Sequence, residues 1–361
     1  MILNKLFLWI LKTKLLMAVL VLLLETGCVV STPAQLRGHE LIPDYPNLTT
    51  IPGPTFDPVE WTKQISIPGA PGAYNPSLVR YGSGYLLSAR FDTMEAGASP
   101  LQKQAQDQMV FVKLNSSFVP EGPVTRERFA QGNNLGTGQD PRLFWWKNEV
   151  WVLFNALNNA IAGSPRRMVL AKLSEKEDGY FKLTEAKFLS YGSGPFEKNW
   201  PPFLVDNELY LLYNTDPHQV IKPDLVTGKC TLVAETKIFP WQRGHVRGGT
   251  PALPYGENEF ISFFHSSKRY RYLNNDWRQI YVMGAYTFSN KAPFAVTRYT
   301  PEAMDSKGFY DQSNHWKIIF PTGLVLDDDY AYVSMGRNDN QVVIVKIRMK
   351  DIERHLLKLQ K

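Results

Sequence analysis

The chain has 361 residues, enough for one large domain or two to three average ones, and 44% of them are apolar. A chain of this composition buries a sizeable core, so intrinsic disorder and a coiled coil are excluded. The formal net charge is +6, but the 40 Lys and Arg residues are scattered along the chain, which argues against nucleic acid as a partner.

The first 30 residues have the pattern of a targeting segment. Lysines at positions 5, 12 and 14 precede an apolar run from Leu15 to Leu24, as in a signal peptide. A transmembrane helix needs roughly 20 apolar residues, so a cleaved signal is the simplest interpretation and a signal anchor is the alternative. Gly27-Cys28 also resembles a bacterial lipoprotein cleavage site, although Glu25 stands where that pattern has Leu. We expect a secretory-pathway protein, secreted or tethered to a membrane.

Residues 31–55 are rich in Pro and Thr, which predicts a stem or linker before the main domain. We expect that domain at 56–350 and a C-terminal tail at 351–361 with a helical pattern. Beyond Cys28 the chain has a single cysteine, Cys230, so the domain has no internal disulfide unless Cys28 stays attached. The spacing of His, Cys and carboxylate residues matches no metal site, and we expect none.

One layout recurs five times between residues 75 and 336. In each copy a proline opens a short apolar run, a Gly, Asn or Asp turn follows, and a strand rich in aromatic residues closes a hairpin. The prolines stand at positions 76, 141, 201, 251 and 321, which are 50 to 70 residues apart. That spacing suits one four-stranded blade per copy and predicts an all-β fold, a five-bladed β-propeller. A β-sandwich followed by a second β domain has the same strand chemistry but does not predict this recurrence.

The prolines also predict where polar residues meet. Proline lacks a backbone N–H and holds the preceding residue extended, so it suits the first residue of an inner strand. The inner strands of a propeller begin at the mouth of its central channel, where residues far apart in sequence form one ring. The polar candidates for this ring are Asn75, Arg90, Asp140, Arg142, Lys198, Asn199, Arg247, Thr250, His265, Asn338 and Asp339.

Five motifs recur here in the order of a known family. They are GQDPR at 138–142, EKNWP at 197–201, RGGTP at 247–251, FFH at 263–265, and FPTG at 320–323 with GRND at 336–339. Together they resemble the blade motifs of glycoside hydrolase family 130 and its glycosyltransferase relatives, and the resemblance covers nearly everything after the stem. It implies a five-bladed propeller that makes or breaks β-mannosides by phosphorolysis, hydrolysis or transfer.

The resemblance also implies roles for single residues. Asp140 matches the catalytic acid, which in that family is thought to donate its proton through a sugar hydroxyl. Asn75 and Arg90 match residues that hold the sugar where the bond is cleaved. Of the remaining substrate-binding candidates, Lys198, Arg247 and His265 fall near positions for phosphate or the acceptor sugar, Asp339 matches a carboxylate that contacts substrate, and Arg142 and Asn199 lie beside these motifs.

The sequence departs from the family pattern at two motifs. Gln139 stands before Asp140, where the family often has Glu, and Arg247-Gly248-Gly249-Thr250 replaces Gly-Gly-Gly or Gly-Pro-Pro. These departures leave the donor, the acceptor and the direction of the reaction open.

The residue types also suit glycosyl transfer on chemical grounds. A carboxyl group serves as an acid when apolar neighbours raise its pKa, and Phe144, Trp145 and Trp146 follow Asp140 closely enough to form an apolar shelf. An inverting hydrolase needs a second carboxylate at roughly 6.5–9.5 Å. A phosphorylase needs a cationic pocket for the attacking anion instead. We therefore expect an oligosaccharide or glycan substrate, inorganic phosphate or a sugar nucleotide as co-substrate, and no other cofactor.

The alternative is a non-catalytic propeller that binds glycans or proteins. In that case Trp200 stacks on sugar faces, Asp140 is a turn residue that caps its own backbone, and His265 is a core histidine. A shared pocket that holds Asp140, Asn75 and Arg90 together with Lys198 favours the enzyme. A scaffold without a small-molecule site has hydrophobic side chains filling the channel mouth.

Overall fold

The computed structural model describes residues 51, 53–92, 107–129, 136–158, 161, 165–192, 194, 196–271, 277–310 and 317–360. The predicted targeting segment and nearly all of the predicted stem lie outside these residues. Within the described ranges, no helix has the length and apolar character needed to cross a membrane.

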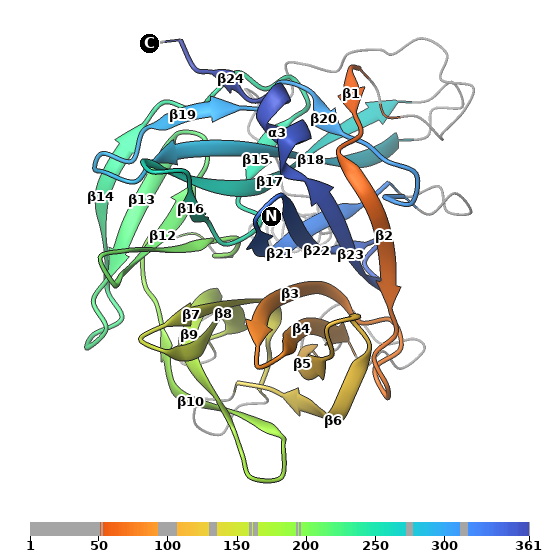
Figure 1. Cartoon of the computed structure of the whole chain (residues 1–361). Coiled ribbons are helices and arrows are strands. Elements are labelled where there is room, and N and C mark those ends of the chain that lie inside the picture. Colours follow the sequence, from red (N-terminus) through yellow and green to blue (C-terminus); the bar gives the residue numbers. More distant parts are fainter. Residues whose placement is uncertain are drawn as a thin grey trace, which may run out of the picture.

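The described chain is built from β-sheets, which we number 1 to 5 in chain order (Figure 1). Sheet 1 contains β3 (Tyr74–Tyr81), β4 (Gly84–Asp92), β5 (Asp107–Leu114) and β6 (Pro120–Glu127). Sheet 2 contains β7 (Gln139–Trp146), β8 (Glu149–Leu157), β9 (Arg166–Glu175) and β10 (Phe181–Phe188). Sheet 3 contains β11 (Pro202–Val205), β12 (Glu208–Asn214), β13 (His218–Pro223) and β14 (Cys230–Thr236). Each is an antiparallel meander of four strands in chain order.

Sheet 4 is larger and less regular than the others. It is centred on a long hairpin of β17 (Glu259–Arg271) and β18 (Trp277–Ser289). Around the hairpin lie β15 (His245–Arg247), β16 (Leu253–Tyr255), β19 (Val296–Tyr299), β20 (Ala303–Met304), β1 (Thr55–Phe56) and β24 (Leu357–Lys358). The basic stretch at residues 268–271 forms the end of β17.

Sheet 5 joins the two ends of the described chain. It contains β21 (Ile319–Asp327), β22 (Tyr330–Arg337) and β23 (Gln341–Arg348), and β2 (Val59–Ile65) pairs with β23 as its outer strand. An N-terminal strand thus completes the last sheet in sequence. The helix α3 (Met349–His355) follows β23, and it begins earlier and ends sooner than the helical pattern at 351–361 predicts.

Tight turns follow from the predicted turn residues. Asp206 and Asn207, between β11 and β12, have φ values of 49° and 63°. Two successive left-handed residues form the type of hairpin turn that matches strand twist, and Asp and Asn adopt it at little cost. Lys147 and Asn148 form the same turn between β7 and β8, with φ values of 53° and 60°.

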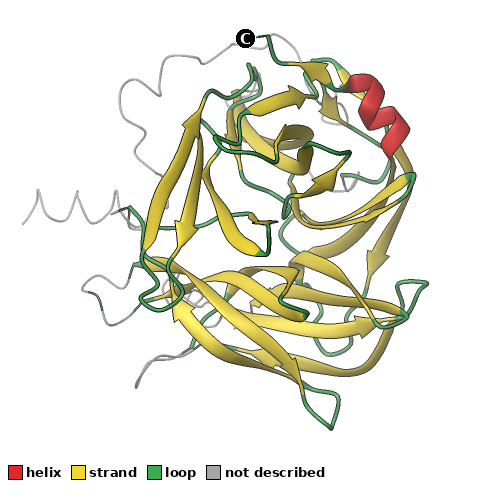
Figure 2. Ribbon diagram, turned by 60° about the vertical axis from the view of Figure 1, so that its left-hand side comes forward, coloured by secondary structure: helices red, strands yellow, loops and turns green. Residues whose placement is uncertain are grey.

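The sheets surround a common axis, as Figures 1 and 2 show. Hydrogen bonds link the sheets, either directly or through residues just outside the strands such as Asn199, Ala252 and Lys317. They join Leu143 N to Ser77 Oγ at 2.9 Å, Arg142 Nη2 to Asn199 Oδ1 at 3.2 Å, Ala252 N to Pro202 O at 3.0 Å, Tyr281 N to Lys317 O at 2.8 Å, and Thr322 Oγ1 to Pro76 O at 2.5 Å. The fold is all-β and propeller-like, as predicted.

The core lies between neighbouring sheets and explains the aromatic content. Phe203 of sheet 3, for example, packs edge-on against Phe260, Phe288 and Phe294 at centroid distances of 5.2–5.4 Å. Burying one large apolar side chain contributes about 1.5–3 kcal/mol. These contacts hold adjacent sheets face to face and so fix the geometry at the axis.

A cavity of about 400 Å³ opens on the axis and has apolar walls. Its lining comes from the inner strands of all five sheets: residues 79–80, 143–145, 202–204, 251–254 and 324–326. Phe144 and Trp145 belong to this lining, four and five residues after Asp140 along β7. Since a strand rises about 3.3 Å per residue, they are too far along the strand to surround Asp140. The predicted apolar shelf at Asp140 is therefore wrong.

Candidate active site

The backbone presents Asn75 and Asp140 in the same unusual way. Each precedes a proline at a break in strand register, between Tyr74 and Ser77 in β3 and between Gln139 and Arg142 in β7. Their φ values are 48° and 52°. Asn and Asp tolerate this left-handed conformation better than other residues with side chains, and such bulges re-aim side chains next to functional sites.

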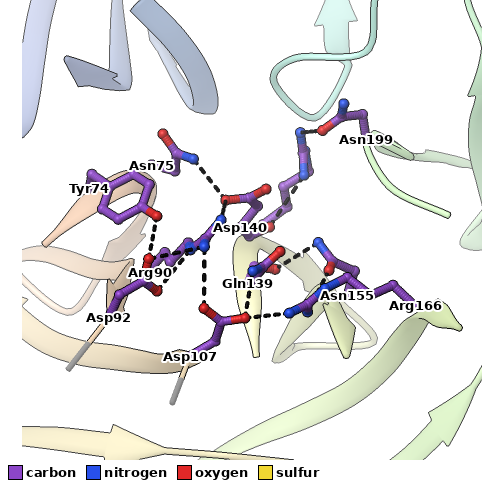
Figure 3. A network of polar contacts seen from close by, with 11 residues as sticks. Tyr74, Asn75, Arg90, Asp92, Asp107, Gln139, Asp140, Asn155, Arg166 and Asn199 are labelled. Atoms are coloured by element: carbon purple, nitrogen blue, oxygen red, sulfur yellow. Dashed lines mark hydrogen bonds and ion pairs between the residues drawn. The ribbon is translucent and has the colours of Figure 1, made fainter. Parts of the chain in front are cut away.

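The two side chains meet directly across sheets 1 and 2 (Figure 3). Asn75 Nδ2 donates a hydrogen bond of 2.7 Å to Asp140 Oδ1, and both residues are buried. Asn75 Oδ1 has no hydrogen-bond partner among the described residues. A Cβ at Gly336 would lie 2.1 Å from that oxygen, so position 336 must be glycine for Asn75 to keep this place.

Arg90 of β4 approaches the same oxygen of Asp140 as Asn75 does. Its Nη1 is 3.9 Å from Asp140 Oδ1. Its Nε and Nη2 each donate to Asp92 at 3.0 Å, and Nη2 also donates to Asp107 at 3.2 Å. The guanidinium stacks over the Tyr74 ring at 4.9 Å. Because the carboxylates engage Nε and Nη2, Arg90 is held in one orientation with Nη1 toward Asp140.

A buried polar layer lies beneath these residues (Figure 3). Asp107 of β5 accepts hydrogen bonds from Gln139 Nε2 and from Arg166 Nη2 as well as from Arg90. Arg166 Nη1 also donates to Asn155 Oδ1 at 3.2 Å. Burial and the facing Asp92 raise the pKa of Asp107 to about 7, although Arg90 and Arg166 favour its ionised form.

Arg142 is 1% exposed, and its hydrogen-bond acceptors among the described residues are neutral. Its Nε donates to Gly249 O at 2.8 Å, its Nη1 to Asp140 O at 3.2 Å, and its Nη2 to Asn199 Oδ1 at 3.2 Å. Burial lowers the pKa of Arg142 to about 10, although the negative charge of Asp140 opposes that shift. Arg142 thus links the segments that contain Asp140, Asn199 and Gly249. The amide oxygen of Asn199 accepts this hydrogen bond.

Lys198 and Asp339 are exposed to solvent but enclosed by protein on most sides. Partial desolvation lowers the pKa of Lys198, while the negative charge of Asp140 opposes that shift. Desolvation and the charge of Asp140 raise the pKa of Asp339, which Arg90 and Lys198 oppose. The charge of Asp140 thus affects the pKa of both side chains.

Arg247 is half-buried and His265 is completely buried in sheet 4, where the two residues face each other across the β15–β17 pair. Burial, with the positive charges of Arg247, Arg142 and Lys198, lowers the pKa of His265 well below its usual value. The ring is neutral at physiological pH, and neither ring nitrogen has a hydrogen-bond partner among the described residues.

Trp200 is 1% exposed and packs edge-on against Tyr213 at 5.4 Å. It is not available to stack on a sugar, so the prediction that Trp200 stacks on sugar faces in a non-catalytic propeller is wrong. Among the residues that the structure describes, no group of three or more His, Cys, Asp or Glu residues is arranged to hold a metal ion.

Sequence reasoning missed the layer that supports Arg90 and Asp140. Asp92 carries a local signal, because residues two apart on a strand share a face. Asn155 stands in the second copy of the repeat at the position that Arg90 has in the first, since Asn155 pairs with Gln139 as Arg90 pairs with Tyr74. Asp107 and Arg166 carry no such signal, since they come from different strands and from no recognisable motif.

No family model matches the sequence. A protein named beta-mannosyltransferase 2 from Komagataella phaffii is 27% identical over 148 residues, which is 39% of this chain and 22% of that relative. The match thus spans about a fifth of the relative's length.

Several solved structures have a similar fold, and one of them comes from a study of the family suggested by the motifs. A β-1,2-mannobiose phosphorylase from Listeria innocua has a TM-score of 0.54 and 13% identity, over 82% of this chain and 93% of that one. A mannose phosphorylase from Leishmania mexicana, solved with phosphate, has a TM-score of 0.54 and 12% identity, over 84% and 93%. A structure from a study of glycoside hydrolase family 130 enzymes that target β-1,2 mannosidic linkages has a TM-score of 0.55 and 14% identity, over 82% and 92%. The resemblance to this family is confirmed at the level of the fold.

Proposed function

We propose that this chain is a carbohydrate-active enzyme that makes or cleaves β-mannosidic bonds, with Asp140 as the general acid. The observation that carries the proposal is the contact of Asp140 with Asn75 and Arg90, which lie on a different sheet. The backbone at Asn75 and at Asp140 is left-handed, and conformations of this kind cluster where a fold presents side chains to a ligand. The printed activities of the similar structures support the substrate class.

The proposal includes a closed ring of five blades, in which sheet 4 is the irregular fifth blade. Two observations support this count. The inner strands of all five sheets line one axial cavity, and β2 completes sheet 5 from the N-terminal side. In such a ring the starts of β3 and β7 face one mouth, so Asn75 and Asp140 share a site with Lys198 and Asp339.

Asp140 has one oxygen suited to proton donation. Its Oδ1 accepts from Asn75 and faces Arg90, which leaves Oδ2 to carry the proton toward the sugar. A positioned acid of this kind contributes about 10²- to 10⁴-fold to the rate. Arg90 Nη1, 3.9 Å from Asp140 Oδ1, provides a donor for a sugar hydroxyl beside it.

Phosphorolysis is the reaction direction that the charges support best. Lys198 and Arg247 are cations whose fields both act on His265, and an anionic nucleophile needs such a pocket in place of a catalytic base. Mannosyl transfer to an acceptor sugar is the second candidate, and the partial match to a β-mannosyltransferase supports it.

We also propose that residues 1–30 direct the chain into the secretory pathway, as a cleaved signal or as an anchor, with 31–55 as the stem of a catalytic domain at 56–350. Expression with a C-terminal tag, followed by fractionation and N-terminal sequencing, tests this. A mature chain that begins after residue 20 supports a cleaved signal. A full-length chain in the soluble cytosolic fraction contradicts the proposal.

The reaction is tested with the isolated domain. It is incubated with β-1,2-mannobiose, with and without inorganic phosphate, and separately with a mannosyl nucleotide and mannose. Phosphate-dependent release of mannose 1-phosphate supports phosphorolysis, and elongation from the nucleotide supports transfer. Binding of mannobiose without any product, under every condition, would favour the non-catalytic propeller.

A further inference from the structure

We propose that Asp107 is a positioning residue that sets the geometry of the acid site by holding Arg90 of sheet 1 and Gln139 of sheet 2 at the same time. The proposal rests on the proposed role of Asp140. It also explains why an amide side chain stands immediately before that residue.

Asp107 is placed to reach both sheets. It lies at the start of β5, directly opposite Asp92 of β4 and diagonal to Arg90, so the three side chains share one face of sheet 1. Its side chain is 1% exposed. From there it accepts from Arg90 within its own sheet and from Gln139 and Arg166 of sheet 2.

The charges around Asp107 show why Arg90 cannot turn away. Two carboxylates directly opposite each other repel, and this repulsion grows with burial. Arg90 Nη2 lies between Asp92 and Asp107 and donates to both, while Arg166 supplies a second positive charge to Asp107. Removing the Asp107 charge would leave Asp92 as the carboxylate that orients Arg90, so the guanidinium would be held less firmly beside Asp140.

Gln139 connects Asp107 to the backbone beside Asp140. It immediately precedes Asp140, and its Nε2 donates to Asp107. Its backbone carbonyl accepts a hydrogen bond of 3.4 Å from Asn155 Nδ2, and Asn155 Oδ1 accepts from Arg166. A closed circuit through Asp107, Gln139, Asn155 and Arg166 therefore anchors the chain at the point where Asp140 adopts its left-handed backbone.

This circuit requires a donor at position 139. A glutamate there would put a third carboxylate against Asp107 and Asp92 in a buried layer. The amide of Gln139 donates without adding charge. We infer that Gln139 and Asp107 form a matched donor–acceptor pair, and that exchanging their chemical characters together preserves the contact.

The exchange is the experiment. Asp107→Asn, Gln139→Glu and the double variant Asp107→Asn/Gln139→Glu are compared with the unaltered domain. In the double variant the carboxylate moves to position 139 and the amide to position 107, so the number of charges and the hydrogen bond between these two positions are kept. The remaining oxygen at position 107 still accepts from Arg90, while Arg166 loses its acceptor on residue 107, so we expect partial recovery. Gln219→Glu is the matched control, because Gln219 Nε2 also donates to a carboxylate, Glu235, but on the exposed surface of sheet 3.

Initial rates with β-1,2-mannobiose and phosphate at pH 8 give the first readout. A misplacement of about 1 Å costs on the order of 100-fold in rate, so each single variant should lose roughly that factor in kcat. The double variant should recover at least tenfold over either single variant, and Gln219→Glu should match the unaltered domain. Losses in the double variant that equal the product of the single losses would overturn the matched pair.

A second readout does not depend on turnover. The Nε–H signal of Arg90, assigned with Arg90→Lys, reports by NMR how firmly its guanidinium is held. Faster proton exchange at this signal in Asp107→Asn, restored in the double variant, supports the proposal even if no mannoside is a substrate. An unchanged Arg90 signal in Asp107→Asn would overturn it. Absence of turnover in the unaltered domain would instead count against the proposed function alone.

Discussion

Asn75 Nδ2 lies 2.7 Å from Asp140 Oδ1, although 65 positions of sequence separate the two residues. Each stands before a proline, at a bulge, with a left-handed backbone. The same local structure, a left-handed residue before proline at a bulge, thus occurs in two adjacent sheets. It points the Asn75 amide and the Asp140 carboxyl group toward each other.

The role of Asp140 predicts the effect of its amide replacement. Asp140→Asn keeps the shape of the side chain and an oxygen for Asn75, but it cannot donate an acidic proton. We expect kcat on a β-mannoside to fall by about 10²- to 10⁴-fold, with the midpoint of thermal unfolding within a few degrees of the unaltered domain. Steady-state kinetics and calorimetry check this, and unchanged turnover would remove the acid role.

A side chain at position 336 should clash with Asn75, and the resulting loss of stability can be measured separately from catalysis. A Cβ there would lie 2.1 Å from Asn75 Oδ1 and 2.8 Å from the Asn75 backbone nitrogen. Gly336→Ala should therefore lower the free energy of unfolding by about 1–3 kcal/mol. Adding Asn75→Ala should recover part of that stability in urea titrations but none of the activity. Full recovery of activity in the double variant would contradict the role of Asn75.

Arg142 should contribute mainly to stability. Arg142→Met leaves the oxygens of Gly249 and Asn199 without their buried donor, at a cost of about 1–3 kcal/mol each. We expect the free energy of unfolding to fall by about 3 kcal/mol or more, as measured in urea. A variant of unaltered stability with weaker binding of β-1,2-mannobiose would instead make Arg142 a direct ligand contact.

Asp107 should link stability to pH. Its pKa is raised to about 7 in the folded domain, against about 3.9 in an unfolded chain. Between these values the folded state holds a proton that the unfolded state has released, so the contribution of Asp107 to stability falls as pH rises from 4 to 7. The unaltered domain should lose more unfolding free energy between pH 5 and pH 8 than Asp107→Asn does. Parallel losses would contradict the raised pKa.

The X-Pro repeat made much of this predictable. It indicated that Asn75 and Asp140 begin equivalent inner strands, and convergence around an axis then follows from the geometry of sheets. The turn at Asp206-Asn207 was predictable because its residues tolerate the left-handed backbone. In each case a short local signal determined the structure.

Other features depend on contacts that no local signal records. Asp107 and Arg166 meet because sheets 1 and 2 pack together, and their strands share no motif. Proximity to Asp140 in sequence was a poor guide to Phe144 and Trp145, because an extended strand carries them to the apolar cavity. Polarity was a poor guide to Arg142, because each of its three guanidinium nitrogens donates a hydrogen bond within the protein.

The central claim is that the mouth around Asn75, Arg90 and Asp140 binds a β-mannoside across its scissile bond. A crystal structure of the Asp140→Asn domain with β-1,2-mannobiose tests this most directly. The account predicts a sugar whose hydroxyls contact Asn75 and Arg90 and whose glycosidic linkage lies beside residue 140. A disaccharide bound only elsewhere on the domain, with this mouth filled by solvent, would contradict it.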